Sequence, residues 1–265
     1  MATIRVNDVS LYYEEYGAGP PILCIHGTGS STELWRSAAA ELGKRGRAIV
    51  YDRRGFSRSE RPEPLVMDVH GHADDAAALL DGLGGEPAIV IGRSHGGEVA
   101  VDLALRYPDR VRALALLEGG AFSLGPGFRR WLGRVHEQVF AAAAGGNDRV
   151  GEAFLRVVLG DAGWEGLPER VKQVFIANGP AILAEERGGL LDVSVEQLAE
   201  LAQPTLVVGA RDSGPAFAEV TELMAAAIPS ARVEWVEGDH LIDAAHPAVL
   251  AFVDDVLART PAATT

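Results

Sequence analysis

The chain has 265 residues, of which 48% are hydrophobic and 23% charged, and it carries a formal net charge of −13 at neutral pH. This composition is typical of a globular protein, and no apolar run approaches the ~18 residues that a membrane-spanning helix needs. The acidic balance argues against nucleic acid or an anionic membrane surface as a partner, because both recruit Lys and Arg.

The first ten residues are polar and lack the apolar segment of a secretory signal. The single cysteine, Cys24, lies in an apolar run, where we expect a buried and unreactive thiol. One cysteine cannot form an intramolecular disulfide and fits a reducing compartment. These features predict a cytoplasmic protein, and the high usage of Ala, Gly and Arg with little Lys is typical of bacteria with GC-rich genomes.

The first half of the chain predicts strands and helices in alternation. In chain order we expect strands at 4–6, 10–16 and 21–26, a helix at 32–42, a strand at 47–52 and a helix at 67–83. Asn7-Asp8 suits a tight hairpin turn between the first two strands. Ser31 or Thr32 is the expected cap of the first helix.

The pattern continues after residue 86 and is interrupted once. We expect a strand at 87–92, a helix at 95–107, strands at 111–117, 204–209 and 232–236, and helices at 215–227 and 247–259, with a frayed end at 260–265. Between 119 and 203 the sequence has helical patterns but no convincing strand, so this segment reads as an insertion.

Continuous apolar strands that alternate with amphipathic helices predict an α/β protein with a mostly parallel sheet covered on both faces. The eight expected strands would form this sheet. We therefore predict a core domain at 1–120 and 204–265, with a helical cap at 121–203.

A candidate nucleophile lies in Gly92-Arg-Ser-His-Gly96, which matches the G-x-S-x-G pattern. The match is meaningful because it falls at the junction between a predicted buried strand and a helix. Such a junction holds the serine in a strained backbone conformation, and glycines on either side let strand and helix approach closely. We expect Ser94 to project from the edge of the sheet.

A serine hydroxyl needs a base to take its proton, and the base needs a carboxylate to orient it. Of the seven histidines, His240 is the one that follows the last predicted strand on a short loop. Asp212, just after the strand at 204–209, gives the expected chain order Ser, Asp, His, and it is favoured because the strand-end loop before the His strand is the commoner place for the acid. Glu118, at the end of the strand at 111–117, is the rival.

An oxyanion hole is expected where His26-Gly-Thr-Gly29 ends the strand at 21–26. Acyl transfer needs two backbone N–H groups aimed at the developing negative charge. We expect these from Thr28 and from His95, the residue after the nucleophile. The ring of His26 is expected to hold the loop, and Asp52-Arg-Arg-Gly-Phe-Ser-Arg-Ser59 to form a buried polar network beside it.

Together these strings resemble the α/β-hydrolase superfamily. Its landmarks occur in order, namely His26-Gly-Thr-Gly, Asp52 to Ser59, Gly92-Arg-Ser-His-Gly-Gly, Tyr107-Pro-Asp-Arg-Val, Gly209-Ala-Arg-Asp and Gly238-Asp-His. The resemblance covers residues 3–120 and 204–258. A serine at position 94 argues against the haloalkane dehalogenase and epoxide hydrolase branches, which have Asp there. The turn that carries Ser94 resembles the nucleophile turns of carboxylesterases, lactonases, haloperoxidase-like perhydrolases and carbon–carbon bond hydrolases.

The resemblance implies that the cap selects the substrate. Several aromatic residues in or beside it could line an apolar pocket over Ser94, and Phe122 and Trp131 are the chosen candidates. Trp35, which follows soon after the expected oxyanion loop, is a third candidate for the wall of this pocket.

The leading functional prediction is hydrolysis of a small carboxylic ester or lactone through an acyl-enzyme on Ser94. No sequence pattern suggests a metal site or a dinucleotide-binding loop, so we expect neither a metal nor a cofactor. The expected partner is the small-molecule substrate, with the protein as monomer or homodimer. The alternatives are a hydroxynitrile-lyase-like or carbon–carbon bond-cleaving enzyme, and a ligand sensor on a hydrolase scaffold.

Overall fold

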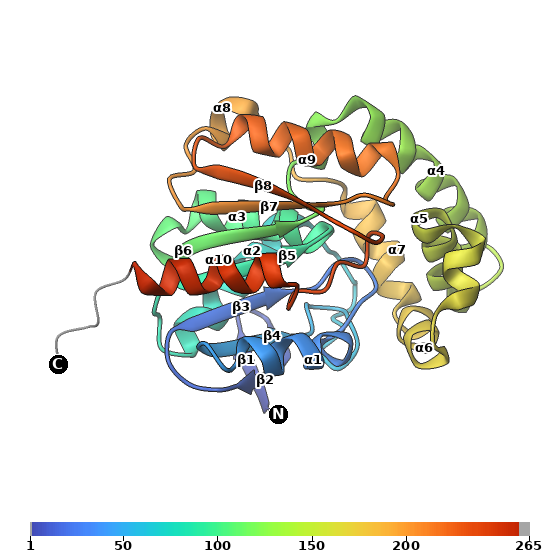
Figure 1. The fold of residues 1–265 in the computed structure, drawn as a ribbon. Coiled ribbons are helices and arrows are strands. Elements are labelled where there is room, and N and C mark those ends of the chain that lie inside the picture. Colours follow the sequence, from blue (N-terminus) through green and yellow to red (C-terminus); the bar gives the residue numbers. More distant parts are fainter. Residues whose placement is uncertain (1, 260–265) are drawn as a thin grey trace.

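An eight-stranded sheet runs through the computed structural model, which describes residues 2–259 (Figure 1). The expected fraying at 260–265 lies outside the described residues. The strand order is β1-β2-β4-β3-β5-β6-β7-β8. The strands are β1 (Ala2–Val6), β2 (Val9–Tyr16), β3 (Pro21–Ile25), β4 (Arg47–Tyr51), β5 (Ala88–Arg93), β6 (Val111–Leu117), β7 (Thr205–Ala210) and β8 (Ala231–Val236).

The sheet is mostly parallel, as predicted. β2 pairs antiparallel with both β1 and β4, and every other neighbouring pair is parallel. Asn7 takes a left-handed backbone (φ 49°) in the β1–β2 turn, which is the conformation that tight hairpin turns require. The α/β fold class is thereby confirmed.

Helices cover both faces of the sheet because alternate strand residues point to opposite sides. Leu23 packs with the helices of one face and Ile22 with those of the other. The first face is covered by α2 (Val69–Gly82), α3 (His95–Arg106) and α9 (Pro215–Ala227), and the second by α1 (Thr32–Leu42) and α10 (Pro247–Ala258).

The expected cap of α1 is only partly correct. Ser31 precedes the helix, but its side chain makes no capping hydrogen bond. Instead Asp52, at the end of β4, accepts the N–H of Thr32 at 2.6 Å. A carboxylate at a helix N-terminus also interacts favourably with the helix dipole, so this contact fixes α1 to the end of β4.

The segment between β6 and β7 contains helices and no strand, as expected from its sequence. These helices are α4 (Pro126–Ala143), α5 (Val150–Gly166), α6 (Glu169–Ala177), α7 (Gly179–Gly188) and the short α8 (Val195–Leu198). α4 to α7 gather at one end of the sheet (Figure 1), where their apolar residues form a separate buried cluster. We call this segment the cap; its domain boundaries stay a prediction.

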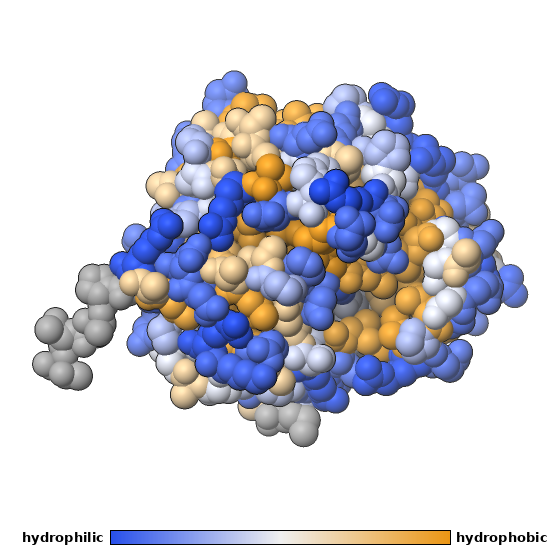
Figure 2. Space-filling model, in the orientation of Figure 1, coloured by the Kyte–Doolittle hydropathy of each residue, from blue (hydrophilic) through white to orange (hydrophobic). Residues whose placement is uncertain are grey.

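The space-filling view shows apolar residues in a hollow between the sheet and the cap (Figure 2). Within residues 2–259, none of the helices is both long and apolar enough to cross a membrane.

Gly119 is expected to be essential for packing the end of β6. An added Cβ would lie 2.3 Å from Ser94 O and 2.9 Å from Gly97 Cα, so Gly119→Ala forces backbone apart. We expect its free energy of unfolding, measured in urea, to fall by about 1–3 kcal/mol. Gly133→Ala is the control, because nothing lies within 4 Å of its added Cβ and alanine favours a helix by up to ~1 kcal/mol. Equal stability of the two variants would contradict this packing argument.

Candidate active site

Ser94 lies between β5 and α3 with a left-handed backbone, at φ 55° and ψ −128°. A non-glycine residue in such a region costs about 1–3 kcal/mol and persists only where its neighbours fix it. Ser94 N donates to Leu117 O at 3.0 Å, which ties the turn to β6. A Cβ on Gly92 would lie 2.4 Å from Gly96 O, so the tight turn requires glycine there.

His240 is oriented by Glu118. Its Nδ1 lies 2.8 Å from Glu118 Oε2, and both side chains are buried. Glu118 directly follows β6 and is itself left-handed, at φ 41°. Its carboxylate also accepts hydrogen bonds from Ala210 N at 2.8 Å and Ser213 Oγ at 2.7 Å. Three donors on one buried carboxylate fix its position firmly.

The expectation that Asp212 orients His240 is wrong in this structure. Asp212 is exposed in the loop after β7, and its Oδ2 accepts from Gly238 N at 3.2 Å. Its own N–H donates to Gly238 O at 3.0 Å. Asp212 therefore joins its loop to the one that carries His240, while Glu118, the rival acid, reaches the imidazole.

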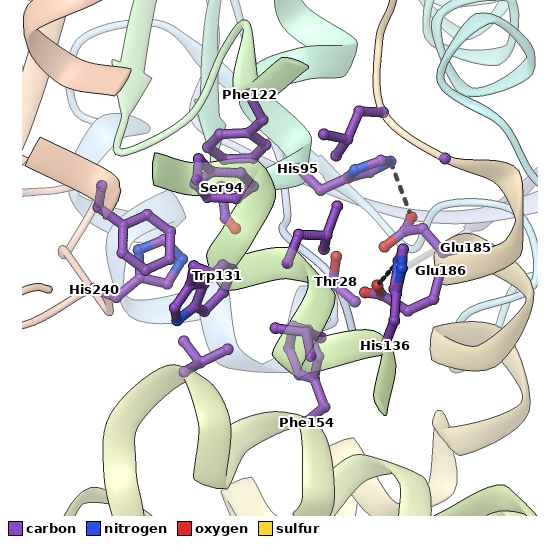
Figure 3. Close-up of a pocket in the computed structure, with 17 residues that line it drawn as sticks. Thr28, Ser94, His95, Phe122, Trp131, His136, Phe154, Glu185, Glu186 and His240 are labelled. Atoms are coloured by element: carbon purple, nitrogen blue, oxygen red, sulfur yellow. Dashed lines mark ion pairs between the residues drawn. The ribbon is translucent and has the colours of Figure 1, made fainter. Parts of the chain in front are cut away.

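A cavity opens beside Ser94 and His240 (Figure 3). Its walls are mainly apolar, which is usual for a small-molecule site. They include Phe122, Phe128, Trp131, Phe154, Leu190 and Phe217. The structure thus places Phe122 and Trp131 in the lining, and Phe217 stacks on the His240 ring at a centroid distance of 4.0 Å.

Trp35 is not among the residues that line this cavity, contrary to expectation. It is buried in the core between α1 and the sheet, with Ala38, Ala39 and Leu42 on the same helix face. Residues three, four and seven positions apart share a face of an α-helix, so the periodicity of α1 turns Trp35 toward the sheet.

Thr28 and His95 line the cavity together with Ser94. The N–H of Thr28 donates to no backbone or side-chain acceptor among residues 2–259. His95 is the first residue of α3, so its N–H has no partner within the helix. Two backbone donors are thus available beside the serine, as an oxyanion hole requires.

His26 holds the loop that contains Thr28. Its Nε2 accepts from Arg53 N at 3.0 Å, and its Nδ1 lies 2.8 Å from Gly27 O. These contacts require the neutral ring with the proton on Nδ1. Burial and the nearby Arg53 hold the pKa of His26 well below its ordinary value, so the ring stays neutral.

A buried ion pair between Arg53 and Glu185 connects this loop to the cap, and the sequence alone did not reveal it. Arg53 Nε donates to His26 O at 3.0 Å. Burial alone would raise the pKa of Glu185, but Arg53 and His95 outweigh it and hold that pKa well below its ordinary value. Glu185 is therefore ionised at neutral pH.

His72, His95 and Glu185 present possible metal-ligand atoms within 4.8 Å of one another. Arg53 already occupies the Glu185 carboxylate with its guanidinium. A metal ion there would face this fixed positive charge at close range in a buried environment, where repulsion is strong. The donor set therefore fits an ion pair better than a metal.

Serine after a strained turn, a paired buried histidine and two backbone donors form the arrangement found in acyl-transfer hydrolases. A family model described as the alpha/beta hydrolase fold matches residues 20–247. The chain belongs to the α/β-hydrolase family. Its membership of this family and its relatives, which are hydrolases, show that it is a hydrolase.

Three relatives illustrate the range of this family. A protein named "Putative carbamate hydrolase RutD" of Azorhizobium caulinodans is 32% identical over 92% of both chains. A 2-hydroxymuconate semialdehyde hydrolase of Pseudomonas is 40% identical over 46% of this chain and 42% of its own. A thermophilic esterase from Thermogutta terrifontis has a structure with a TM-score of 0.78 and 26% identity, covering 96% of this chain and 98% of its own.

Glu185→Gln is expected to lower the free energy of unfolding by about 3–5 kcal/mol at neutral pH, because it leaves Arg53 buried without a counter-ion. The exposed Glu137 on α4 supplies the matched control, Glu137→Gln, which should change stability by less than ~0.5 kcal/mol.

The same variants test the pH dependence of this ion pair. Because the pKa of Glu185 is depressed in the folded state, its contribution is complete above the unfolded value of ~4.3 and is lost as the pH falls through the folded value. The difference in free energy of unfolding between the wild type and Glu185→Gln should thus stay constant from neutral pH down to the unfolded pKa of ~4.3. It should narrow at lower pH. A gap that grows in acid would contradict the assignment.

Proposed function

We propose that this protein hydrolyses a carboxylic ester or lactone of a small, partly apolar substrate through an acyl-enzyme on Ser94. The observation that carries the proposal is the 2.8 Å contact between His240 and Glu118 beside the strained Ser94. His240 serves as general base, Glu118 orients it, and the N–H groups of Thr28 and His95 stabilise the oxyanion.

In the first half of the reaction, Ser94 Oγ attacks the carbonyl carbon and its proton passes to His240 Nε2. Ser94 Oγ donates no hydrogen bond to His240 among residues 2–259, and such catalytic contacts often tighten only when substrate binds. Negative charge develops on the carbonyl oxygen near Thr28 and His95. The tetrahedral intermediate then expels the alkoxide, which takes the proton from His240, and leaves Ser94 acylated.

In the second half, a water molecule loses a proton to His240 and attacks the acyl carbon. The resulting intermediate expels Ser94 Oγ, which recovers its proton from His240, and the acid is released. Throughout, Glu118 keeps the Nδ1 proton in place and stabilises the imidazolium that forms twice. A lactone follows the same steps, with the alcohol and acid retained in one product.

The relatives support acyl transfer to water. The Thermogutta structure is that of an esterase, and the Azorhizobium relative is named for carbamates, whose carbonyl carbon is attacked in the same way. The proposal needs only the chain's own residues, water and a small substrate, in a cytoplasmic monomer or homodimer.

Cleavage of a carbon–carbon bond is the second candidate, favoured by the 40% identity to the 2-hydroxymuconate semialdehyde hydrolase over 125 residues. The same serine, base and oxyanion donors would then act on a vinylogous diketone. Comparison of simple esters, carbamates and vinylogous diketones as substrates separates these candidates.

Ser94→Ala is expected to lower kcat/KM for p-nitrophenyl esters by roughly five or more orders of magnitude, the effect of removing an activated nucleophile. A fluorophosphonate probe should label the wild type and not this variant, as read by intact mass. An unlabelled wild-type protein that is folded and inactive on all three substrate classes would rule out covalent serine catalysis.

Glu118→Gln and Asp212→Asn test which carboxylate orients the base. Because a neutral amide cannot fix the imidazole in the right tautomer, kcat should fall by about 10³- to 10⁴-fold in Glu118→Gln. Asp212→Asn should stay within about tenfold, since the Asp212 carboxylate accepts a hydrogen bond from the backbone N–H of Gly238 in the His240 loop, a bond that an amide oxygen can also accept. A larger loss in Asp212→Asn than in Glu118→Gln would reverse the assignment.

A further inference from the structure

The cavity beside Ser94 has a polar end that the proposed reaction does not use. His136 on α4 and Glu186 on α7 line it, and Figure 3 shows them across the cavity from His240. His136 Nε2 lies 3.1 Å from Glu186 Oε2. The walls between the two ends are largely apolar, so this pair and the neighbouring Glu185 form a separate polar end of the pocket.

Glu186 keeps an unused hydrogen-bond acceptor. Its side chain is only 8% exposed, and His136 is its ion-pair partner through Oε2. Oε1 has no partner among the residues that the structure describes. Oε1 is not fully enclosed by protein, so a ligand that enters the cavity can donate a hydrogen bond to this oxygen.

His136 compensates the charge of Glu186 without filling its acceptor capacity. The hydrogen bond to Glu186 outweighs partial burial and raises the pKa of His136 above its ordinary value. The hydrogen bond therefore favours the imidazolium form of His136, whose charge would offset that of a carboxylate in an apolar pocket. The neighbouring Glu185 is engaged by Arg53 and leaves Glu186 as the free acceptor at this end.

We propose that this end of the cavity is a recognition subsite for a hydrogen-bond donor, a hydroxyl or an ammonium group, at the end of the substrate remote from the scissile carbonyl. Oε1 of Glu186 accepts that hydrogen bond. The substrate is then an ester or lactone with an apolar body and a polar donor tip. This inference rests on the proposed function for the identity of the scissile group.

A carboxylate tip is disfavoured by the same residues. A carboxylate tip has no proton to donate to Glu186 Oε1 and would bring acceptor oxygens together in a poorly hydrated pocket, which is unfavourable. The Nε2 atom of His136, which could donate to such a carboxylate, already lies 3.1 Å from Glu186 Oε2.

The test compares p-nitrophenyl esters of straight-chain acids, from butanoyl to octanoyl, that end in methyl, hydroxyl, ammonium or carboxylate. At the chain length that spans the cavity, the wild type should prefer the hydroxyl or ammonium ester over its methyl counterpart in kcat/KM. The donor group with the larger ratio of kcat/KM to that of the methyl ester is the group that the subsite prefers at the end of the substrate. In Glu186→Leu this donor-to-methyl ratio should fall by about 10- to 100-fold, the value of a hydrogen bond to a charged group.

Glu137→Gln on the exposed side of α4 is the matched control and should leave the ratio unchanged. A second measurement needs no turnover, namely calorimetric binding of the same esters to Ser94→Ala with and without Glu186→Leu. The donor ester should bind Ser94→Ala more tightly than the methyl ester, and Glu186→Leu should remove the difference.

The outcomes separate this inference from the proposed function. A wild type that hydrolyses esters with no donor preference at any length, in rate or in binding, overturns the subsite alone. Preference for the carboxylate tip also overturns it and makes His136 the recognition group. If no ester is hydrolysed while Ser94→Ala still binds the donor esters better through Glu186, the subsite stands and the ester hydrolase proposal fails.

Discussion

The buried ion pair between Arg53 and Glu185 holds together the parts that meet above the sheet. Arg53 follows β4 and is fully buried, and it contacts both the His26 loop and α7. Two buried charges lose much hydration, and this loss is offset only where the geometry is good and further hydrogen bonds are made. The contact of Arg53 Nε with His26 O supplies one of these bonds.

Asn178, at the start of α7, provides a second connection between cap and loop. Its Nδ2 donates to Gly29 O at 3.0 Å and to Ser30 O at 3.1 Å, and its Oδ1 accepts from Ser57 N at 2.8 Å. The loop that carries Thr28 is therefore fixed from above by the cap as well as from below by the sheet. Because an oxyanion hole depends on fixed donor positions, these contacts of the cap would support the proposed chemistry as well as the shape of the pocket.

Much of the fold could be predicted from the sequence, because the strands of a parallel sheet are continuous apolar runs and their helices have one apolar face. Ser94 and His240 could be proposed as nucleophile and base for the same reason, since each follows a recognisable strand. The acid could not be chosen this way. Asp212 and Glu118 both follow strands, and only the structure shows that the Glu118 side chain reaches His240. The available sequence signal for the acid is a glutamate that directly follows the strand Val111–Leu117 and precedes two glycines.

The place of Trp35 and the partner of Arg53 also depend on contacts between residues that are far apart in the sequence. The position of Trp35 close to the Thr28 loop in sequence predicts a place in the pocket wall, whereas the helical periodicity of α1 turns it into the core. The partner of Arg53 lies 132 positions away along the chain, and no local pattern indicates such a pair. Sequence patterns predict which face of an element is buried, but they do not specify which side chains of distant elements meet.

The position of α7 links the two ends of the proposed site. Glu185 and Glu186 are consecutive, so their side chains leave the helix about 100° apart. Glu185 forms an ion pair with Arg53, which follows β4, and Glu186 forms one with His136 on α4 at the cavity wall. The same helix therefore fixes the His26 loop and sets the distance between Ser94 and the polar end of the cavity. A shift of α7 would disturb the proposed oxyanion donors and the proposed substrate subsite together, so in this proposal substrate selection and transition-state stabilisation depend on one packed element.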